Sequence, residues 1–201
     1  KKRQIQAINK LSNLSFVRHL NSQEVNKISG VNIDNEGLFF PYSGFLNPRA
    51  LCNAYTQHNN ISCLTNTEAL NLNFKNNIWQ VEDSSANIVQ APIVIIANSH
   101  DASNFQQSRH YPLTKSFGQI DQYPVTELNS SLNCVVCGKG YVLPGSSDSQ
   151  FIGGITNTDK ALATNIRAVA EKNLELVKSM SPSLAKDYGK NVLTKSRTGV
   201  R

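Results

Sequence analysis

The residues best placed to do chemistry follow a short apolar run in the middle of the chain. Residues 93–97 are Ile, Val, Ile, Ile and Ala, and the polar residues Asn98, Ser99 and His100 follow directly. An uninterrupted apolar run with polar borders predicts a strand buried on both faces, as in a parallel sheet covered by helices. Ligands of such sheets bind at the carboxyl ends of the strands, where small residues let the backbone come close. Ala97, Asn98 and Ser99 occupy that position.

The glycine-rich turn that usually binds the pyrophosphate of a dinucleotide does not accompany this strand end. No G-x-G-x-x-G turn occurs in the chain, so the main anchor of any bound pyrophosphate would lie outside this sequence. His100 is a lone histidine at a predicted strand end, and such histidines are more often hydrogen-bonded surface groups than catalytic bases. We therefore assign no catalytic role to His100.

The cysteines raise the question of a metal or redox site. The chain has four of them, Cys52, Cys63, Cys134 and Cys137. A structural zinc site needs four ligands, usually from two C-x-x-C pairs or from one pair with suitably spaced histidines, and His100 and His110 lack that spacing. A redox pair requires a helix N-terminus, which is not expected here. We predict no metal site and interpret Cys134 and Cys137 as reduced residues at a strand end.

Composition predicts a globular protein. The 201 residues, 39% of them hydrophobic, are enough to bury a core in one domain or two small ones. The longest apolar run is far shorter than the roughly 20 residues of a membrane span, and the basic residues at positions 1–3 precede polar glutamines instead of a signal-peptide core. We expect a cytoplasmic protein without membrane contact. The net charge of +6 and the pI near 9.2 permit a polyanionic partner such as tRNA.

The first half of the chain predicts two helices and several short strands. Residues 21–27 are typical of a short capped helix, and Pro48 begins a second helix that runs to Asn59 and Asn60. Strands are expected at 37–41, 61–64, 69–74, 78–81 and 88–89, with Asn76 and Asn77 as a tight turn. They lead into the buried strand at 93–97.

The second half has a different pattern. Short strands separated by Gly, Ser, Pro and Asp are predicted at 118–120, 134–136, 141–143 and 151–155. Residues 164–180 carry one apolar stripe at helical spacing, and Ser181-Pro182 ends that helix. These patterns predict an α+β fold with an antiparallel sheet and flanking helices.

Seven short segments occur in an order and spacing that resemble those of the D-amino-acid-oxidase-like flavoproteins. They are 37–41 (GLFFP), 44–48 (GFLNP), 93–100 (IVIIANSH), 117–119 (FGQ), 140–144 (GYVLP), 153–156 (GGIT) and 199–201 (GVR). Within that family, the GLFFP, ANSH and GYVLP segments are most similar to the oxidoreductase half of bifunctional tRNA-modifying enzymes. The likeness extends from about residue 15 to residue 201.

The resemblance implies a reaction. These enzymes use FAD to remove the carboxymethyl group from carboxymethylaminomethyl-uridine at the wobble position of tRNA, and a methyltransferase half then methylates the product with S-adenosylmethionine. The substrate carries a CH2 group between a secondary amine and a carboxylate, and the flavin takes a hydride from that carbon. FAD is therefore the expected cofactor and tRNA the expected partner, while S-adenosylmethionine belongs to a half that this chain lacks.

The resemblance also implies substrate-binding residues. Arg201 matches the arginine that binds the substrate carboxylate, and a planar guanidinium can bond both carboxylate oxygens. Tyr141 matches a tyrosine whose hydroxyl helps to hold the same carboxylate. Gln119 lies where relatives carry Gln or Glu on a strand near the flavin. Phe117 departs from the pattern, because many relatives have a basic or small residue there.

Cofactor contacts are implied in the first half of the chain. Ala69 matches the position whose backbone pairs with the adenine of FAD. Ala97, Asn98 and Ser99 match the segment that passes the cofactor. No residue is assigned to catalysis, since hydride transfer from a neutral amine needs no strong base.

The chain lacks the G-x-G-x-x-G turn and the methyltransferase half. We therefore expect an inactive fragment of a longer protein, an interior piece of a D-amino-acid-oxidase-like FAD-binding fold. Residues 1–45 would begin the substrate-binding region, 46–108 would be an interior part of the FAD-binding domain, and 109–201 would form the substrate-binding sheet and helix. Two alternatives stay open. One is a glycine- or sarcosine-oxidase-like enzyme for a small free amino acid, and the other is a cofactor-free basic RNA-binding module.

Overall fold

The computed structural model of the chain describes residues 15–146, 148–157 and 164–200. Contacts divide the chain into two units, each described by itself below. Unit 1 comprises the described part of Lys1–Phe45 together with Ser116–Gly199, and unit 2 comprises Leu46–Lys115 and Val200. Arg201, the predicted carboxylate-binding residue, lies outside the described residues.

Unit 1 is built on a five-stranded sheet in the order β10-β6-β9-β8-β7. The strands are β6 (Phe117–Pro124), β7 (Val136–Cys137), β8 (Tyr141–Ser146), β9 (Ser149–Asn157) and β10 (Lys195–Val200). β9 pairs antiparallel with both β6 and β8, and β8 pairs antiparallel with β7. The antiparallel sheet predicted from the second half of the sequence is thus present, and β10 is an additional edge strand that the sequence pattern did not indicate.

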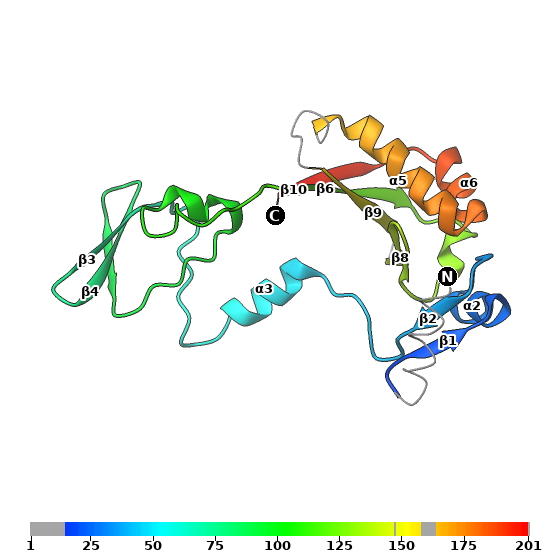
Figure 1. The fold of residues 1–201 in the computed structure, drawn as a ribbon, viewed down its shortest axis with the longest axis horizontal. Coiled ribbons are helices and arrows are strands. Elements are labelled where there is room, and N and C mark those ends of the chain that lie inside the picture. The colour runs from blue at the N-terminus through cyan, green and yellow to red at the C-terminus, as the bar shows by residue number, and fades with distance from the viewer. Residues whose placement is uncertain (1–14, 147, 158–163, 201) are drawn as a thin grey trace. The chain divides into compact units, whose positions relative to one another are not determined.

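Two helices, α5 (Ile166–Met180) and α6 (Pro182–Lys190), lie on one face of this sheet (Figure 1). The apolar stripe of α5 packs on the sheet, and Val177, Leu184 and Ile152 are completely buried in the resulting core. Pro182 ends α5 as predicted. It also occupies the first turn of α6, a helix that the sequence analysis missed, and the Ser181 hydroxyl caps α6 by accepting the Leu184 N–H at 3.4 Å.

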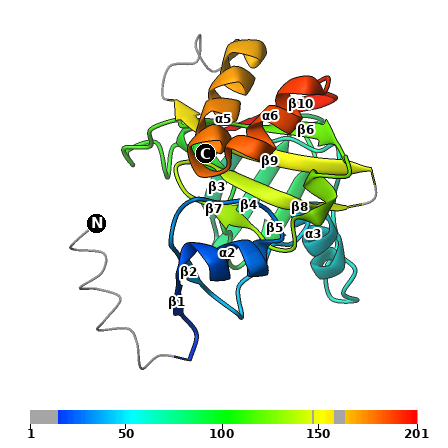
Figure 2. The ribbon, with the colours of Figure 1, turned by 90° about the vertical axis from the view of Figure 1, so that its right-hand side faces the viewer.

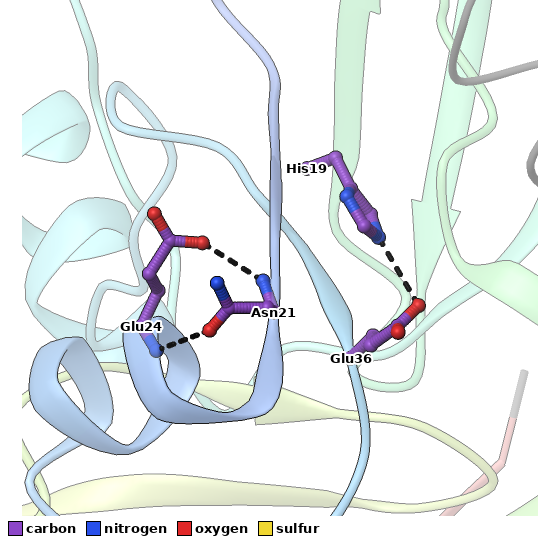
Figure 3. Close-up of polar contacts among 4 residues, drawn as sticks. All are labelled: His19, Asn21, Glu24 and Glu36. Atoms are coloured by element: carbon purple, nitrogen blue, oxygen red, sulfur yellow. Dashed lines mark hydrogen bonds and ion pairs between the residues drawn. The ribbon is translucent and has the colours of Figure 1, made fainter.

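The N-terminal part of unit 1 contains β1 (Arg18–Leu20), α2 (Ser22–Ser29) and β2 (Gly37–Phe39), and β1 and β2 form a two-stranded antiparallel sheet beside α2 (Figure 2). The predicted capped helix is confirmed. Asn21 is its cap: the Asn21 side chain accepts the Glu24 N–H at 3.0 Å, and the Glu24 carboxylate accepts the Asn21 N–H at 2.9 Å (Figure 3). His19 and Glu36 form an ion pair at 3.4 Å next to this cap (Figure 3).

Unit 2 contains helix α3 (Pro48–Thr56) and a three-stranded antiparallel sheet in the order β3-β4-β5. The strands are β3 (Ala69–Lys75), β4 (Ile78–Asp83) and β5 (Ile88–Ala91). Asn76 and Asn77 both adopt left-handed backbone angles, with φ of 51° and 62°, which suits the tight turn predicted between β3 and β4. A short 3-10 helix, η1 (Ser99–Asn104), follows the sheet.

Two strand predictions in unit 2 are wrong. Residues 93–97 have no regular structure, and the side chains of Ile93 and Ile95 are 76% and 83% exposed. Residues 61–64 are irregular as well. A strand requires a neighbouring strand for its backbone hydrogen bonds, and none of the described residues supplies one to either segment. Consequently Asn98 and Ser99 lie at the start of η1 and not at a strand end.

Candidate functional site

The central sheet of unit 1 separates two sets of side chains. Asp121 on β6 pairs with Ile152 on β9, which pairs with Val142 on β8, and all three are buried on the face covered by α5 and α6. The next residues along each strand point the other way, because side chains alternate across a sheet. We call the side that carries Ile120, Tyr141 and Gly153 the Tyr141 face.

Tyr141 lies over a glycine on the Tyr141 face. It is the cross-strand partner of Gly153, which in turn pairs with Ile120. A Cβ atom added to Gly153 would be only 2.6 Å from the Tyr141 hydroxyl oxygen and 2.7 Å from the ring carbon that bears it. The ring therefore occupies the space that a side chain at position 153 would fill. This contact fixes where a half-buried hydroxyl is presented above the middle of the sheet.

The opposite face contains a buried polar network around Asp121. This carboxylate is completely buried and accepts three hydrogen bonds, from Gln119 Nε2 at 2.7 Å, Asn173 Nδ2 at 2.7 Å and Ser196 Oγ at 2.5 Å. The donors come from β6, α5 and β10. Among the described residues, no cationic side chain forms an ion pair with Asp121. These three hydrogen bonds compensate the desolvation of this group.

The charge of Asp121 affects a neighbouring tyrosine. Burial, and secondarily the negative charge of Asp121, raise the pKa of Tyr123 to about 12. Tyr123 faces the same helix-covered side and packs against Tyr188 of α6, with 5.2 Å between the ring centroids. Both rings are part of the hydrophobic core, so the Asp121 network borders that core directly.

Gln119 and Tyr141, which the resemblance assigned to one substrate site, lie on opposite faces of the sheet. The Gln119 side chain is buried on the helix-covered face, where Nε2 donates both to Asp121 and to the Ile166 carbonyl oxygen at 2.9 Å. Its Oε1 is buried and has no hydrogen-bond partner in the described part of the chain. Since both Nε2 partners are acceptors, the orientation of the amide is fixed. A direct substrate contact of Gln119 stays a prediction.

The predicted cofactor residues all lie in unit 2. Ala69 is the first residue of β3, which among the described residues pairs with β4 and with no other strand, so its other edge has no strand partner there. Ala97, Asn98 and Ser99 are all exposed. Ser99 has a φ of 57°, a left-handed conformation that is unfavourable for serine. Exposed backbone at these positions is chemically suited to contacts with a flat, polar cofactor.

His100 is the titratable group beside this segment. Its Nε2 lies 3.2 Å from a carboxylate oxygen of Asp101, while Nδ1 is buried without a hydrogen-bond partner among the described residues. Its side chain is 23% exposed, and the nearby Ser103 hydroxyl donates to its carbonyl oxygen at 3.0 Å. The histidine is thus held in place locally by η1.

Cysteines and other possible metal ligands are a further set of chemically relevant side chains. The four cysteines are free, and burial raises the pKa of the Cys134 and Cys137 thiols, which favours their neutral form. In the described ranges, no three His, Cys, Asp or Glu side chains come together as possible metal ligands. Within the same ranges, no helix is both long and apolar enough to cross a membrane.

Three members of the Asp121 network were missed by the sequence analysis. Asn173 interrupts the apolar stripe of α5 between Val169 and Val177, at helical spacing, which is a signal that it faces the core. Asp121 follows Gln119 by two residues in a strand, which places both on one face. Ser196 carried no signal, because its partner is 75 residues away in the chain.

A family model of FAD dependent oxidoreductases, named DAO, matches residues 2–201. The chain belongs to the DAO family of FAD-dependent oxidoreductases. This finding confirms the family that the seven segments indicated, and the observed helices and sheets confirm the α+β fold class.

Curated relatives indicate which group of proteins within the family this chain resembles. The chain is 31% identical to the "tRNA 5-methylaminomethyl-2-thiouridine biosynthesis bifunctional protein MnmC" of Pseudomonas entomophila, over 87% of this chain and 27% of that protein. The protein of the same name from Stutzerimonas stutzeri is 33% identical, over 85% of this chain and 26% of the relative. The one from Pseudomonas syringae pv. tomato is 35% identical, over 78% and 24%. The chain therefore spans about a quarter of the length of these relatives.

Solved structures share the fold. Glycine oxidase from Geobacillus kaustophilus aligns with a TM-score of 0.78 at 14% identity, over 100% of this chain and 55% of that chain. Iminodiacetate oxidase from Chelativorans sp. BNC1 aligns with a TM-score of 0.74 at 17% identity, over 100% of this chain and 57% of that chain. These similarities extend along the whole chain and support the D-amino-acid-oxidase-like fold.

Proposed function

We propose that the chain is part of an FAD-dependent oxidoreductase that removes the carboxymethyl group from carboxymethylaminomethyl-uridine at the tRNA wobble position. The observation that carries this proposal is the identity of 31–35% to proteins named for tRNA 5-methylaminomethyl-2-thiouridine biosynthesis, over 78–87% of this chain. In those relatives the described region would correspond to an interior piece, with a methyltransferase half and its S-adenosylmethionine elsewhere. A tRNA substrate also agrees with the predicted cytoplasmic location.

In this proposal, the substrate carboxylate is bound by the two residues that the resemblance implies. The Tyr141 hydroxyl would donate a hydrogen bond to the substrate carboxylate, and Arg201, which follows β10 in the sequence, would bond both carboxylate oxygens. The half-buried apolar residues of the Tyr141 face, among them Ile120 and Leu143, would exclude water from the CH2 group beside the amine. Loss of a hydride from that CH2 and of the proton on the nitrogen leaves an imine, whose hydrolysis by water releases the two-carbon unit as an aldehyde and leaves an aminomethyl group on the uridine.

In the same proposal, unit 2 contributes to cofactor binding. The free edge of β3 at Ala69 fits pairing with the edge of an adenine, and the exposed backbone at Ala97, Asn98 and Ser99 fits close approach of a cofactor. FAD, when bound, would accept the hydride. The sequence contains no G-x-G-x-x-G loop for the pyrophosphate, so we expect the isolated chain to bind FAD weakly and not to turn over.

The distribution of charge bears on tRNA binding. Of the net charge of +6, four positive charges belong to Lys1, Lys2, Arg3 and Lys10, and residues 1–14 contain no acidic residue. These residues lie outside the described ranges. The described units carry nearly equal numbers of acidic and basic residues, so a cofactor-free RNA-binding module draws little support from their surface charge.

A second candidate is an oxidase of a small free amine, as predicted for glycine- or sarcosine-oxidase-like enzymes. The whole-chain similarity to glycine oxidase, with a TM-score of 0.78, favours it as the alternative. Both candidate enzymes must bind a carboxylate that lies next to an amine. They differ in what the nitrogen carries, a uridine in tRNA or a hydrogen or methyl group.

The test uses the parent protein that contains this chain, purified with its flavin. It is incubated with tRNA that carries carboxymethylaminomethyl-uridine, and nucleosides are quantified by mass spectrometry. Conversion to aminomethyl-uridine is the expected result, and a Tyr141→Phe variant should convert the same tRNA with a raised KM. Oxidation of glycine or sarcosine without conversion of tRNA would replace the proposal by the second candidate. A flavin absorption band with nearly stoichiometric FAD in the isolated chain would contradict its expected inactivity.

A further inference from the structure

We infer that Asp121 is a positioning residue that holds β10, and with it Gly199 and Val200 at the end of the strand, in register for substrate binding. This inference deepens the proposed function and depends on it for the role of Arg201. The observation behind it is the hydrogen bond from Ser196 Oγ on β10 to Asp121 Oδ1 on β6, at 2.5 Å. No substrate contact is attributed to Asp121 itself.

The position of β10 at the edge of the sheet gives such a side-chain bond, a tether between two strands, a purpose. β10 is an edge strand whose one neighbour in the sheet is β6. Just before β10, the Thr194 N–H donates to the Gln122 carbonyl oxygen at 2.9 Å. An edge strand with one partner can slip along it, since backbone hydrogen bonds are the same at every register. A buried side-chain bond distinguishes one register from the others.

Asp121 can supply this selectivity because its carboxylate is completely buried. A slip by one residue moves β10 by about 3.3 Å and turns the Ser196 side chain to the Tyr141 face. Asp121 Oδ1 would then lose the Ser196 donor, and the long side chain of Lys195 or Arg197 would take its place on the helix-covered face. The loss of a buried hydrogen bond and the crowding of a long side chain into a space that holds a serine both disfavour the slipped register.

Further bonds keep Asp121 itself from moving. Its Oδ2 accepts from Asn173 Nδ2, and Asn173 Oδ1 accepts the Ile155 N–H of β9 at 3.1 Å. Gln119 is bonded both to Asp121 and to the Ile166 carbonyl at the start of α5. The carboxylate is therefore fixed to β6, β9 and α5 at once. Because these three elements hold the Asp121 carboxylate in place, its bond to Ser196 can determine the position of β10.

The network also gives Gln119 a role that fits its position. Its side chain points away from the Tyr141 face, and it orients the Asp121 oxygen that receives the Ser196 hydroxyl. Gln119 would thus act on the substrate site through Asp121 and β10, without touching the substrate.

Hydrogen exchange of the 201-residue chain tests the tether. Ser196→Ala should speed the exchange of β10 amides by about tenfold or more, while the amides of β8 keep their protection, because a lost bond to a charged group weakens local stability by at least that factor. Ser196→Thr retains the hydroxyl and should restore protection. Ser146→Ala, an exposed hydroxyl on β8 of the same sheet, is the matched control and should leave β10 unchanged. Unchanged β10 exchange in Ser196→Ala would overturn the tether.

Carboxylate binding tests the positioning role. In the FAD-loaded parent protein, acetate serves as a probe of the carboxylate site, followed by the change in flavin absorption. Ser196→Ala should raise the Kd of acetate by about tenfold and raise KM more than it lowers kcat, and Ser196→Thr should reverse both effects. Faster β10 exchange with an unchanged Kd would overturn the positioning role. If wild-type protein converts no tRNA, the proposed function fails, while the exchange result still decides the tether.

Discussion

Replacing Gly153 by alanine tests the placement of Tyr141 most directly. The added Cβ would lie 2.6 Å from the Tyr141 hydroxyl oxygen, 2.7 Å from the adjacent ring carbon and 3.0 Å from the Gln119 carbonyl oxygen. Ordinary contact requires at least 3.4 Å, so the end of the Tyr141 ring must move by roughly 1 Å. The hydroxyl is the far end of a rotatable side chain, and it moves more easily than the backbone oxygen does.

The expected loss in the free energy of unfolding follows from two opposing terms. Overpacking of this kind costs about 1–3 kcal/mol. Alanine also restricts the unfolded chain more than glycine does, which offsets roughly 0.4–1 kcal/mol of that loss. We expect Gly153→Ala to destabilise unit 1 by about 1–2 kcal/mol and, in the FAD-loaded parent protein, to raise KM more than it lowers kcat, since the hydroxyl is displaced.

A double-mutant cycle separates the clash with Tyr141 from other effects. In a Tyr141→Ala background the ring is gone, and the Gly153→Ala change should cost less than about 0.5 kcal/mol. Unfolding in urea, followed by far-UV circular dichroism, measures all four proteins. Gly189→Ala is the control, because Gly189 lies in α6 with no atom within 4 Å of an added Cβ, and alanine there should stabilise by roughly 0.5–1 kcal/mol. An equal cost of Gly153→Ala in both backgrounds would refute the placement of the ring.

Three further predictions address single features of the chain. Gly30→Ala should lower the free energy of unfolding by more than about 3 kcal/mol in urea melts. Gly30 has a φ of 77°, and an added Cβ would lie 1.9 Å from the Ser131 carbonyl oxygen. A loss below about 1 kcal/mol, on the order of a surface change, would contradict this contact. Ser99→Gly should stabilise unit 2 by about 1 kcal/mol, since Ser99 has a φ of 57°, and slower hydrogen exchange around η1 would report it, whereas faster exchange would count against strain at this residue. Because the pKa of Tyr123 is raised to about 12, the folded chain keeps the hydroxyl proton to a higher pH than the unfolded chain does. The protonated Tyr123 therefore stabilises the fold fully below about pH 10. This stabilisation is lost as the pH rises to about 12, with a slope near 1.4 kcal/mol per pH unit. Tyr123→Phe should reduce that slope in melts at a series of pH values, and an unchanged slope would assign it to other groups, such as Tyr188, whose pKa is also raised by burial.

Elements with local causes were predictable from the sequence. The cap at Asn21 and Glu24 and the Asn76-Asn77 turn depend on residues within four positions of one another. The helix at 164–180 and the antiparallel strands around it followed from periodicity, and they are present with small shifts of their ends. The family followed from the order of seven segments, and the family model that matches residues 2–201 confirms it.

Features that depend on distant partners were not predictable in the same way. The apolar run at 93–97 has strand composition and yet no neighbour among the described residues to pair with, so it remains irregular. The bond between Ser196 of β10 and Asp121 of β6 joins residues that lie 75 positions apart in the chain. Sequence patterns could indicate that Asp121 and Asn173 face a core, but not that they meet each other.

The sequence by itself therefore determined the family, the candidate residues and most of the local elements of this chain. Only the tertiary structure decided which face of the sheet each candidate occupies: Tyr141 stands over Gly153 on one side, and Gln119 is bonded to Asp121 on the other. The physical reason is that strand register determines the face of every side chain, and register is set by pairing between strands that lie far apart in the sequence.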